Sequence, residues 1–241
     1  MLIIFSVEFC SAFTLLNANQ RGWDKKVLVF NLNPANCSSD TRFNIVEAMA
    51  LWNSVNGSEL KLELGATDSV ATAAQAIAGA FSEEAVIVCD SSFAATTGTN
   101  PNVTAAVSNI LINSNIQIAK GFLILNAVAS AAASLSLNSQ LRTQIIVAHE
   151  IGHMIGLGHS SDISALMYYS SATRNNFSLS QDDVDGFLYL YPRDETNKAV
   201  FMGGCGSLKN AEPPPTKMIF TLLALCLLPL AMTIKFRFRN Q

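Results

Sequence analysis

The sequence predicts an α/β domain built around a mixed sheet, and three observations lead to that prediction. Short apolar runs rich in β-branched residues recur along the chain, and turn-forming residues separate them. An amphipathic helical pattern lies between the first two runs. A second helical pattern, apolar on almost every side, follows the last run. Alternation of this kind is typical of a sheet with helices packed on it.

Five runs are expected to form strands, and they differ in how deeply they should be buried. The second run alternates apolar and charged residues, as a half-buried strand does, whereas the third is apolar throughout. An alanine-rich segment between these two, at 68–82, is expected to form a small helix or a packed loop. The five expected strands are residues 27–32, 60–64, 85–89, 107–112 and 121–125.

Two longer helices are expected. The first covers 41–55, where apolar residues recur at helical spacing and Trp52 is expected in the core. The apolar residues at helical spacing are Phe43, Ile45, Met49, Trp52 and Val55. The second covers 139–155, where Leu141 and Ile145 belong to an apolar stripe and the remaining surface is also largely apolar. A helix that is apolar almost all round is expected at the centre of the domain.

The second helix leads into HEIGHMIGLGHS, from His149 to Ser160, which contains all three histidines of the chain. His149 and His153 are one helical turn apart, so their rings leave the same face of the helix. Gly156 permits a backbone conformation that a residue with a Cβ would resist, so the chain can turn there and bring His159 back. Three nitrogen ligands with a fourth position open are typical of a catalytic zinc site.

Glu150 follows the first of these histidines and should lie beside the metal rather than on it. A carboxylate there can accept a proton from the water that the metal activates and later give it to a leaving amine. The short motif H-E-x-x-H also arises by chance, in which case the histidines are ordinary surface residues. The added glycine and third histidine make that alternative much less probable.

The extended motif resembles that of the metzincin metallopeptidases, and Ser160 after the third histidine resembles their matrixin branch. Met167, in the sequence SALMY, resembles the methionine turn beneath the three histidines of that family. Residues 179–192 are similar to the last helix of matrixin catalytic domains. The resemblance implies that Met167 supports the site and that Asp182 and Asp183 anchor the C-terminal helix.

The resemblance also implies a metzincin-like catalytic domain with a twisted five-stranded mixed sheet, a central metal-binding helix and a C-terminal helix. One antiparallel edge strand would line the cleft, and 107–112 is the candidate for that strand. An extended peptide could then pair with it as an added strand. The alternative is that 107–112 is a plain hairpin arm.

Tyr169 stands where matrixins usually have a proline, which puts any specificity borrowed from that branch in doubt. In the astacin and serralysin branches a tyrosine at this position can turn its hydroxyl toward the metal, and Tyr169 could steady an oxyanion in that way. The alternative, which the sequence favours, is a wall of the specificity pocket. The chain also lacks a pro-segment cysteine, histidines for a second zinc and a haemopexin-like repeat. It therefore resembles a minimal, bacterial-type matrixin domain.

The net charge of −3 provides no basic surface, so we expect no nucleic-acid partner, and we expect a monomer. Cys10 and Cys226 lie in apolar terminal runs, and the other three cysteines have no metal-ligand spacing. Cys37 and Cys89 can form a disulfide outside the cytosol, but the sequence favours the alternative of two buried thiols.

The two ends of the chain indicate export and membrane attachment. Residues 1–18 resemble a signal peptide, although no basic residue precedes the run and Glu8 interrupts it; a buried first helix is the alternative. The peptidase domain is expected at 19–193, followed by a Gly- and Pro-rich linker at 194–216. A transmembrane helix is expected at 217–235, with a basic cytoplasmic tail at 236–241.

The C-terminal segment has a second interpretation. The Gly-Gly-Cys-Gly sequence around Cys205, followed by a linker, an apolar run and a basic end, also resembles a bacterial sorting signal. In such proteins the helix is removed, so the domain would be released or anchored again through Cys205.

The sequence therefore predicts an exported zinc endopeptidase that acts on peptides or proteins and is tethered to a membrane. One catalytic zinc is the expected cofactor, and the sequence provides no support for an additional Ca²⁺ site. Two other functions remain as hypotheses: a zinc-binding surface module without turnover, and a membrane adhesion protein in which the histidines are incidental. Glu150 argues against both, because a protein that only binds zinc has no need of it.

Overall fold

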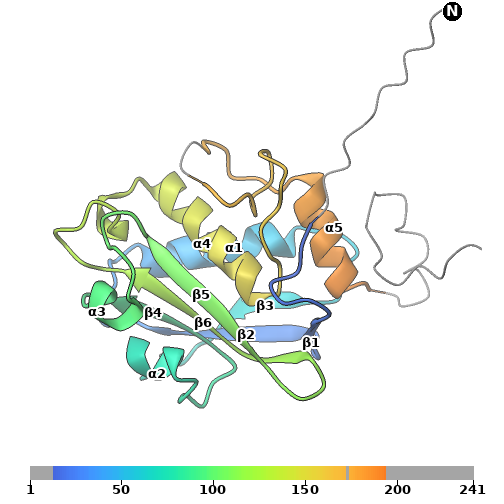
Figure 1. Cartoon of the computed structure of the whole chain (residues 1–241), viewed down its shortest axis with the longest axis horizontal. Helices are drawn as coiled ribbons and strands as arrows, with labels where there is room; N and C mark the ends of the chain where they lie inside the picture. Colours follow the sequence, from blue (N-terminus) through green and yellow to red (C-terminus); the bar gives the residue numbers. More distant parts are fainter. Residues whose placement is uncertain (1–12, 172–173, 194–241) are drawn as a thin grey trace, which may run out of the picture. The chain divides into compact units, whose positions relative to one another are not determined.

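The computed structural model of the 241-residue chain describes residues 13–171 and 174–193, which form the predicted α/β domain (Figure 1). In this part of the chain the strands are β1 (Arg21–Trp23), β2 (Val27–Asn33), β3 (Lys61–Leu64), β4 (Ala85–Asp90), β5 (Ala106–Ile112) and β6 (Gln117–Asn126). The α-helices are α1 (Thr41–Asn53), α2 (Ala73–Ile77), α3 (Phe93–Thr97), α4 (Gln140–Met154) and α5 (Gln181–Leu190). A short 3₁₀ helix, Leu135–Leu137, precedes α4.

The strands form one mixed sheet in the order β1-β6-β4-β2-β3, with β5 also paired to β6. The β5–β6 pairing is antiparallel and the others are parallel, which confirms the predicted mixed sheet with one antiparallel strand. Among the described residues β5 pairs with no strand other than β6, so its far side is a free edge. The sheet has six strands rather than five. The additional strand, β1, has only three residues, too few to produce an alternating pattern.

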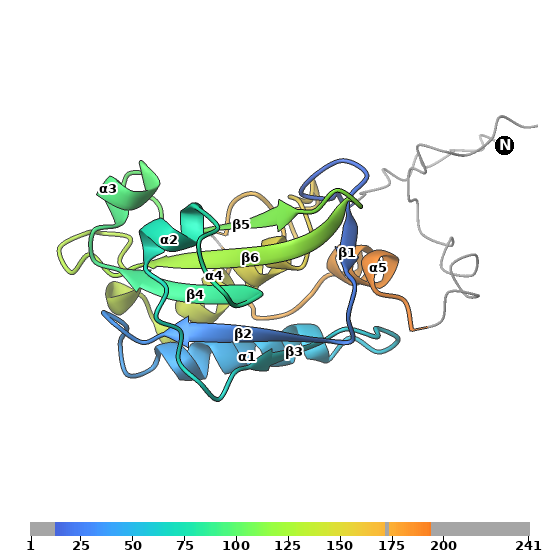
Figure 2. The ribbon, with the colours of Figure 1, turned by 90° about the horizontal axis from the view of Figure 1, so that it is seen from below.

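Helices cover both faces of the sheet (Figure 2). Strand β4 and the part of β6 from Gly121 onward are buried on both sides, so their side chains alternate between two hydrophobic clusters. One set faces α1 and α4 and includes Ala85, Ile87, Leu123 and Leu125. The other set packs with residues of α2 and α3 and includes Val86, Val88, Phe122 and Ile124. The alanine-rich segment thus contains a small helix, α2, which is one of the two predicted outcomes.

The two long helices lie close to their predicted bounds, but one residue of each predicted apolar stripe faces solvent rather than the core. Trp52 in α1 is fully buried, whereas Phe43 is 50% exposed. Phe43 precedes Ile45 by two positions and therefore points to the opposite side of the helix. Leu141 in α4 is 41% exposed, because burial along that helix begins only at Thr143.

Helix α4 is held at its C-terminal end by two aromatic side chains. The carbonyls of the last turn of a helix have no partner within the helix. The Trp23 indole donates a hydrogen bond to the Met154 carbonyl at 2.9 Å, and the Tyr191 hydroxyl donates to the Ile155 carbonyl at 2.6 Å. Burial raises the pKa of Tyr191, so this hydroxyl keeps its proton. These bonds fix the point at which the chain leaves α4.

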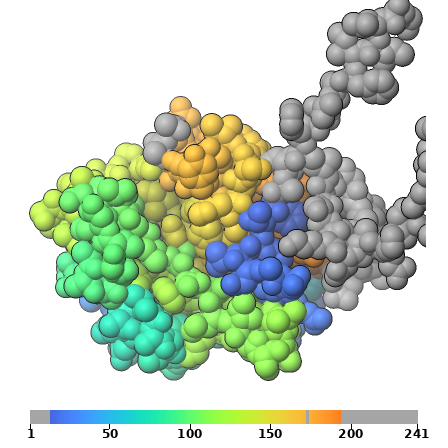
Figure 3. Space-filling model, viewed as in Figure 1, coloured from blue at the N-terminus to red at the C-terminus, as the bar shows by residue number. Residues whose placement is uncertain are grey.

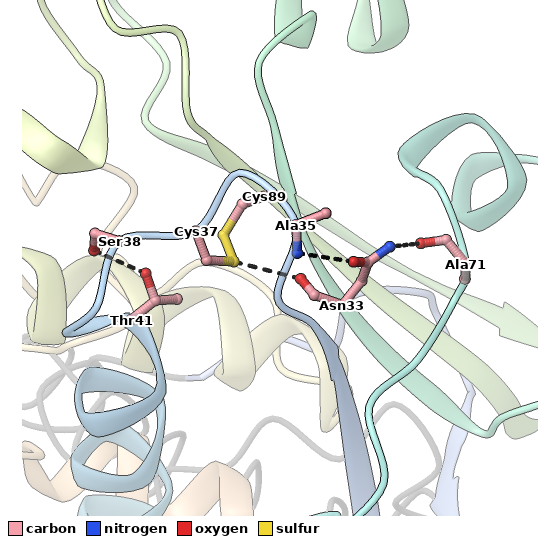
Figure 4. Close-up of a disulfide and its surroundings, with 7 residues drawn as sticks. All are labelled: Asn33, Ala35, Cys37, Ser38, Thr41, Ala71 and Cys89. Carbon is pink, nitrogen blue, oxygen red and sulfur yellow. Dashed lines mark hydrogen bonds between the residues drawn. A yellow bond between two sulfur atoms is a disulfide. The ribbon is translucent and has the colours of Figure 1, made fainter.

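Cys37 and Cys89 form a disulfide, with their Cα atoms 5.2 Å apart (Figure 4). The bond connects the turn after β2 to the end of β4. Beside it, the Asn33 side chain donates to the Ala71 carbonyl at 2.7 Å and accepts from the Ala35 amide at 3.0 Å. The alternative of two buried thiols, which the sequence favours, is therefore not what the structure contains.

Replacing both cysteines by serine is expected to lower the free energy of unfolding by about 2–4 kcal/mol. The disulfide closes a loop between residues 52 positions apart, and it restricts the unfolded chain accordingly. Urea unfolding of the oxidised wild type and of Cys37→Ser/Cys89→Ser measures the loss. Dithiothreitol should remove the difference between the two proteins, and a reductant effect of equal size on the variant would contradict the assignment.

Residues 1–12 of the predicted signal peptide lie outside the described residues. The segments expected at 194–216, 217–235 and 236–241 also lie outside them. In the described part, no helix combines the length and apolar character that crossing a bilayer requires. Residues 13–18 are described and pack on the domain, where Leu15 forms an antiparallel bridge with Leu157. The predicted boundary at residue 19 stays a prediction, and a chain that began there would lack these contacts.

Candidate metal centre

The structure brings His149, His153 and His159 together at the end of α4. Their ring centroids are 4.8 Å apart for the pairs that include His153 and 5.4 Å apart for His149 and His159. Their candidate ligand atoms all lie within 4.8 Å of one another. His149 and His153 are buried and His159 is exposed, so the cluster is open to solvent on the His159 side.

Backbone carbonyls fix the tautomers of the two helical histidines. The Nδ1 of His149 lies 2.7 Å from the Leu166 carbonyl oxygen, and the Nδ1 of His153 lies 2.8 Å from that of Leu157. Because a carbonyl oxygen can only accept, each Nδ1 must carry the hydrogen. Each Nε2 therefore keeps its lone pair for a metal, an arrangement typical of histidine ligands.

Burial favours the metal-binding form of the His153 and His159 imidazoles. It lowers the pKa of His153, and His149 acts in the same direction, whereas Glu150 and the Leu157 carbonyl oppose the effect. Burial also lowers the pKa of His159, and His153 contributes to that decrease. A lower pKa favours the neutral ring at neutral pH, and only the neutral ring has a lone pair to donate.

Gly156 turns the chain from α4 toward the third histidine. Its φ of +103° lies in the region that side chains disfavour. A Cβ at this position would also lie 2.4 Å from the side-chain nitrogen of Gln20. That nitrogen donates to the Gly156 carbonyl at 2.6 Å. The turn thus depends on glycine for its conformation and on Gln20 for its hydrogen bond.

The start of the described chain holds the loop that carries His159. The Leu16 amide donates to the Gly156 carbonyl at 2.9 Å, and the Gly158 amide donates to the Thr14 carbonyl at 2.8 Å. The Thr14 hydroxyl donates to the carbonyl of His159 itself at 2.7 Å. In the space-filling view these N-terminal residues, drawn in blue, lie against the yellow segment that contains the histidines (Figure 3). The sequence did not single out any of these N-terminal residues.

Met167 packs against α4 at Gly152, between the two helical histidines in sequence. It is 2% exposed, and a Cβ at Gly152 would lie 2.2 Å from its sulfur. The methionine therefore occupies the space that a larger residue at position 152 would need. On its other side the Met167 carbonyl accepts from the Ser160 amide at 2.8 Å, which connects it to the loop of the third histidine.

Asp183 connects this turn to α5. Its carboxylate accepts hydrogen bonds from the backbone amides of Leu166 and Met167 at 2.7 and 2.9 Å. It also accepts from the amide and hydroxyl of Ser180, at 2.8 and 2.9 Å, in a capping box at the start of α5. Leu166 therefore connects Asp183 to a candidate metal ligand: its amide donates to Asp183, and its carbonyl accepts from His149.

Asp182, the other residue that the resemblance implicates in anchoring α5, has a different environment. Burial raises the pKa of its carboxyl, a hydrogen bond with Ser160 opposes this, and the neighbouring Asp183 adds to the increase. Its Oδ2 has no hydrogen-bond partner among the described residues. Asp183 thus holds α5 to the methionine turn, whereas Asp182 contacts Ser160, the residue that follows the third histidine. The anchoring role that the resemblance implies for Asp182 stays a prediction.

Glu150 is half-buried, next to His149 and on the side of α4 that faces β5. Its Oε2 accepts a hydrogen bond from the Ser108 hydroxyl at 2.5 Å. Ser108 was not singled out from the sequence, because one serine in an apolar strand has no motif around it.

Tyr169 is 68% exposed and its ring packs on Tyr168, with centroids 4.4 Å apart. A hydrogen bond to Tyr169 raises the pKa of Tyr168.

The cluster fits a single zinc ion. It offers three nitrogen donors, two of them in fixed tautomers, and imidazole is a ligand that zinc accepts readily. Among the described residues no fourth His, Cys, Asp or Glu completes the cluster. A site with three protein ligands keeps one position for water or substrate, as catalytic zinc sites do.

Comparisons with known proteins match this chain to a family of metallopeptidases. The family model described as matrixin matches residues 22–192. Neutrophil collagenase of Homo sapiens is 53% identical over 49 residues, which are 20% of this chain and 10% of that protein. Metalloendoproteinase 1 of Glycine max is 53% identical over 47 residues, 19% of this chain and 15% of that protein. Matrilysin of Homo sapiens is 46% identical over 52 residues, 21% of this chain and 20% of that protein. The matches cover at most a fifth of the length of these relatives.

Proposed function

Because the chain belongs to the matrixin family of metallopeptidases, we propose that it is a zinc-dependent endopeptidase that hydrolyses peptide bonds in peptide or protein substrates. The observation that carries this proposal is the cluster of His149, His153 and His159, with Glu150 beside it. All three histidines would bind the same zinc ion, each through one ring nitrogen. When bound, zinc would polarise a peptide carbonyl and lower the pKa of a water molecule to about 7.

Glu150 would act as general base and then as general acid. The Ser108 hydroxyl occupies only its Oε2, and no hydrogen bond to its Oε1 is found among the described residues. That oxygen would accept a proton from the attacking water and pass it to the leaving amine. Tyr169 is placed next to the methionine turn, and its role, either steadying the oxyanion or forming a pocket wall, stays a prediction.

The substrate would bind along β5 in extended form. This strand is the antiparallel edge of the sheet, and its free side offers backbone donors and acceptors. A peptide that added a strand there would lie beside α4, which packs against β5 and carries Glu150. The backbone pairing would fix the position of the scissile bond without dictating its sequence.

Export is also part of the proposal, together with attachment through the segment at 217–235. The apolar run at 1–18 supports export, and the apolar run at 217–235 with its basic end supports attachment. The Cys37–Cys89 disulfide is consistent with an oxidising compartment. An intact C-terminus at Gln241, measured by mass spectrometry of the mature protein, would exclude removal of the C-terminal segment.

A peptide-library digest with the purified protein, made with and without a chelator, tests the activity. We expect cleavage that o-phenanthroline abolishes and zinc restores. Chelation should also lower the melting temperature by roughly 5–10 °C, because a ligand present at 100 times its Kd stabilises the folded state by about 2.7 kcal/mol.

Each alternative function gives a different result in the same experiment. A zinc-binding module without turnover would retain zinc and lose stability in chelator, yet cleave no peptide in the library. A protein in which the histidines are incidental would purify without zinc and keep its melting temperature.

A further inference from the structure

We propose that Ser108 is a positioning residue for Glu150: its hydroxyl holds one oxygen of the carboxylate and thereby aims the other at the reacting water. This inference rests on the proposed function and names a residue that neither the motif nor the comparisons indicate. It starts from the hydrogen bond of 2.5 Å between Ser108 Oγ and Glu150 Oε2, which joins residues 42 positions apart.

The side of β5 that faces α4 is apolar except at Ser108. Alternate residues of a strand share a face, so Ala106, Ser108 and Ile110 point the same way. Ala106 and Ile110 are buried in the same hydrophobic cluster as the apolar residues of α4 from Ile145 to Met154. Packing alone would favour a small apolar residue between them, because a hydroxyl removed from water costs free energy unless it finds a partner. The partner that the Ser108 hydroxyl finds is Glu150.

The geometry also explains what this hydrogen bond does. A glutamate has three rotatable side-chain bonds, and Glu150 is only half-buried, so packing by itself leaves its carboxylate several orientations. A hydroxyl can donate only one hydrogen, and here it reaches Oε2. The carboxylate is thereby fixed through one oxygen, and the lone pairs of Oε1 stay available for a proton.

The position of Ser108 connects this orientation to the substrate strand. Ser108 pairs with Leu123 of β6 through its backbone, and its opposite backbone edge is the free edge of the sheet. One residue therefore belongs to the strand on which a peptide would lie and also contacts the proposed base. The hydrogen bond from Ser108 would therefore fix the position of the Glu150 carboxylate relative to a peptide bound to β5.

Three variants test the proposal in the zinc-loaded, full-length protein. Ser108→Ala removes the hydroxyl with little change in volume, Ser108→Thr retains it with a side chain suited to a strand, and Ser54→Ala is the matched control. The Ser54 hydroxyl donates to the Leu51 carbonyl at 2.6 Å on the exposed end of α1, outside the site. We expect Ser108→Ala to lower kcat about tenfold with KM within about twofold of wild type, the scale of effect seen when a residue that orients an active-site group is lost. Ser108→Thr should keep at least about half of the wild-type kcat, and Ser54→Ala should match wild type.

Crystal structures of the zinc-loaded wild type and Ser108→Ala provide a readout that does not depend on turnover. We expect the hydrogen bond in the wild type and a rotated or spread carboxylate in the variant, with zinc content unchanged. The proposal would be overturned by the same carboxylate orientation in both proteins, by a change in KM alone, by failure of threonine to rescue, or by zinc loss that accounts for the fall in kcat. If the wild type holds zinc and cleaves nothing, the proposed function fails, and the two structures still decide whether Ser108 positions Glu150.

Discussion

Replacing Glu150 by alanine is expected to lower kcat for peptide hydrolysis by about 10²–10⁴-fold while zinc content stays at the wild-type level. The reduction is the usual size for losing a general base. Zinc should remain because its three candidate ligands are the histidines, and Glu150 is not among them. Steady-state kinetics on a fluorogenic peptide, combined with elemental analysis of each protein, measures both quantities.

Two further variants separate proton transfer from packing. Glu150→Gln keeps the shape of the side chain and an oxygen that can accept from Ser108, but it cannot accept a proton, so it should be as inactive as the alanine variant. Glu63→Ala removes an exposed carboxylate from β3, at the opposite end of the sheet, and should behave as wild type. Hydrolysis by Glu150→Ala at the wild-type rate would exclude the proposed mechanism.

Replacing Asp183 by alanine is expected to reduce the free energy of unfolding by about 3–5 kcal/mol. The carboxylate is 1% exposed and accepts four hydrogen bonds, two of them from the amides of the methionine turn. Each buried donor that loses its partner costs about 1–3 kcal/mol. Unfolding in urea, with chelator present in every sample so that metal binding does not contribute, measures the loss.

Asp185 provides the matched control on the same helix. It lies two residues further along α5, and its carboxylate accepts from Gln181 at the surface. Asp185→Ala should therefore change the free energy of unfolding by no more than about 0.5 kcal/mol.

Asp183→Ala should also weaken zinc binding by about 10–100-fold, because the Leu166 carbonyl that orients His149 belongs to the segment that Asp183 holds. Equal losses of unfolding free energy in Asp183→Ala and Asp185→Ala would show that the hydrogen bonds of Asp183 do not stabilise the fold more than a surface contact does.

The sequence was sufficient to predict the parts of this domain that depend on local patterns. Short apolar runs predicted the five longer strands, and helical spacing predicted the two long helices, because each signal extends over several residues. The short elements β1 and α3 were missed for the opposite reason: a strand of three residues and a helix of five each contain fewer than two periods of their pattern. Phe43 was misplaced because a hydrophobic residue need not lie on the buried stripe of its helix.

The ligand set of the candidate site could be predicted, but its supports could not. The three histidines and Glu150 lie within eleven consecutive residues, and the spacing itself implies their convergence. Thr14, Gln20 and Ser108 contact the same site from segments 42 to 145 positions away. Contacts of this kind depend on how strands and loops are placed in space, and no periodicity in the sequence encodes that placement.

The supports of the metal centre come from both ends of the domain, and this has a consequence for how the protein matures. Thr14 holds the His159 loop from the amino-terminal side, and Asp183 fixes the methionine turn from the carboxyl-terminal side. A chain emerging from the ribosome presents Asp183 only after every histidine has already appeared. Loading with zinc is thus expected to be a late event, and the nascent polypeptide should remain inert until Asp183 has emerged.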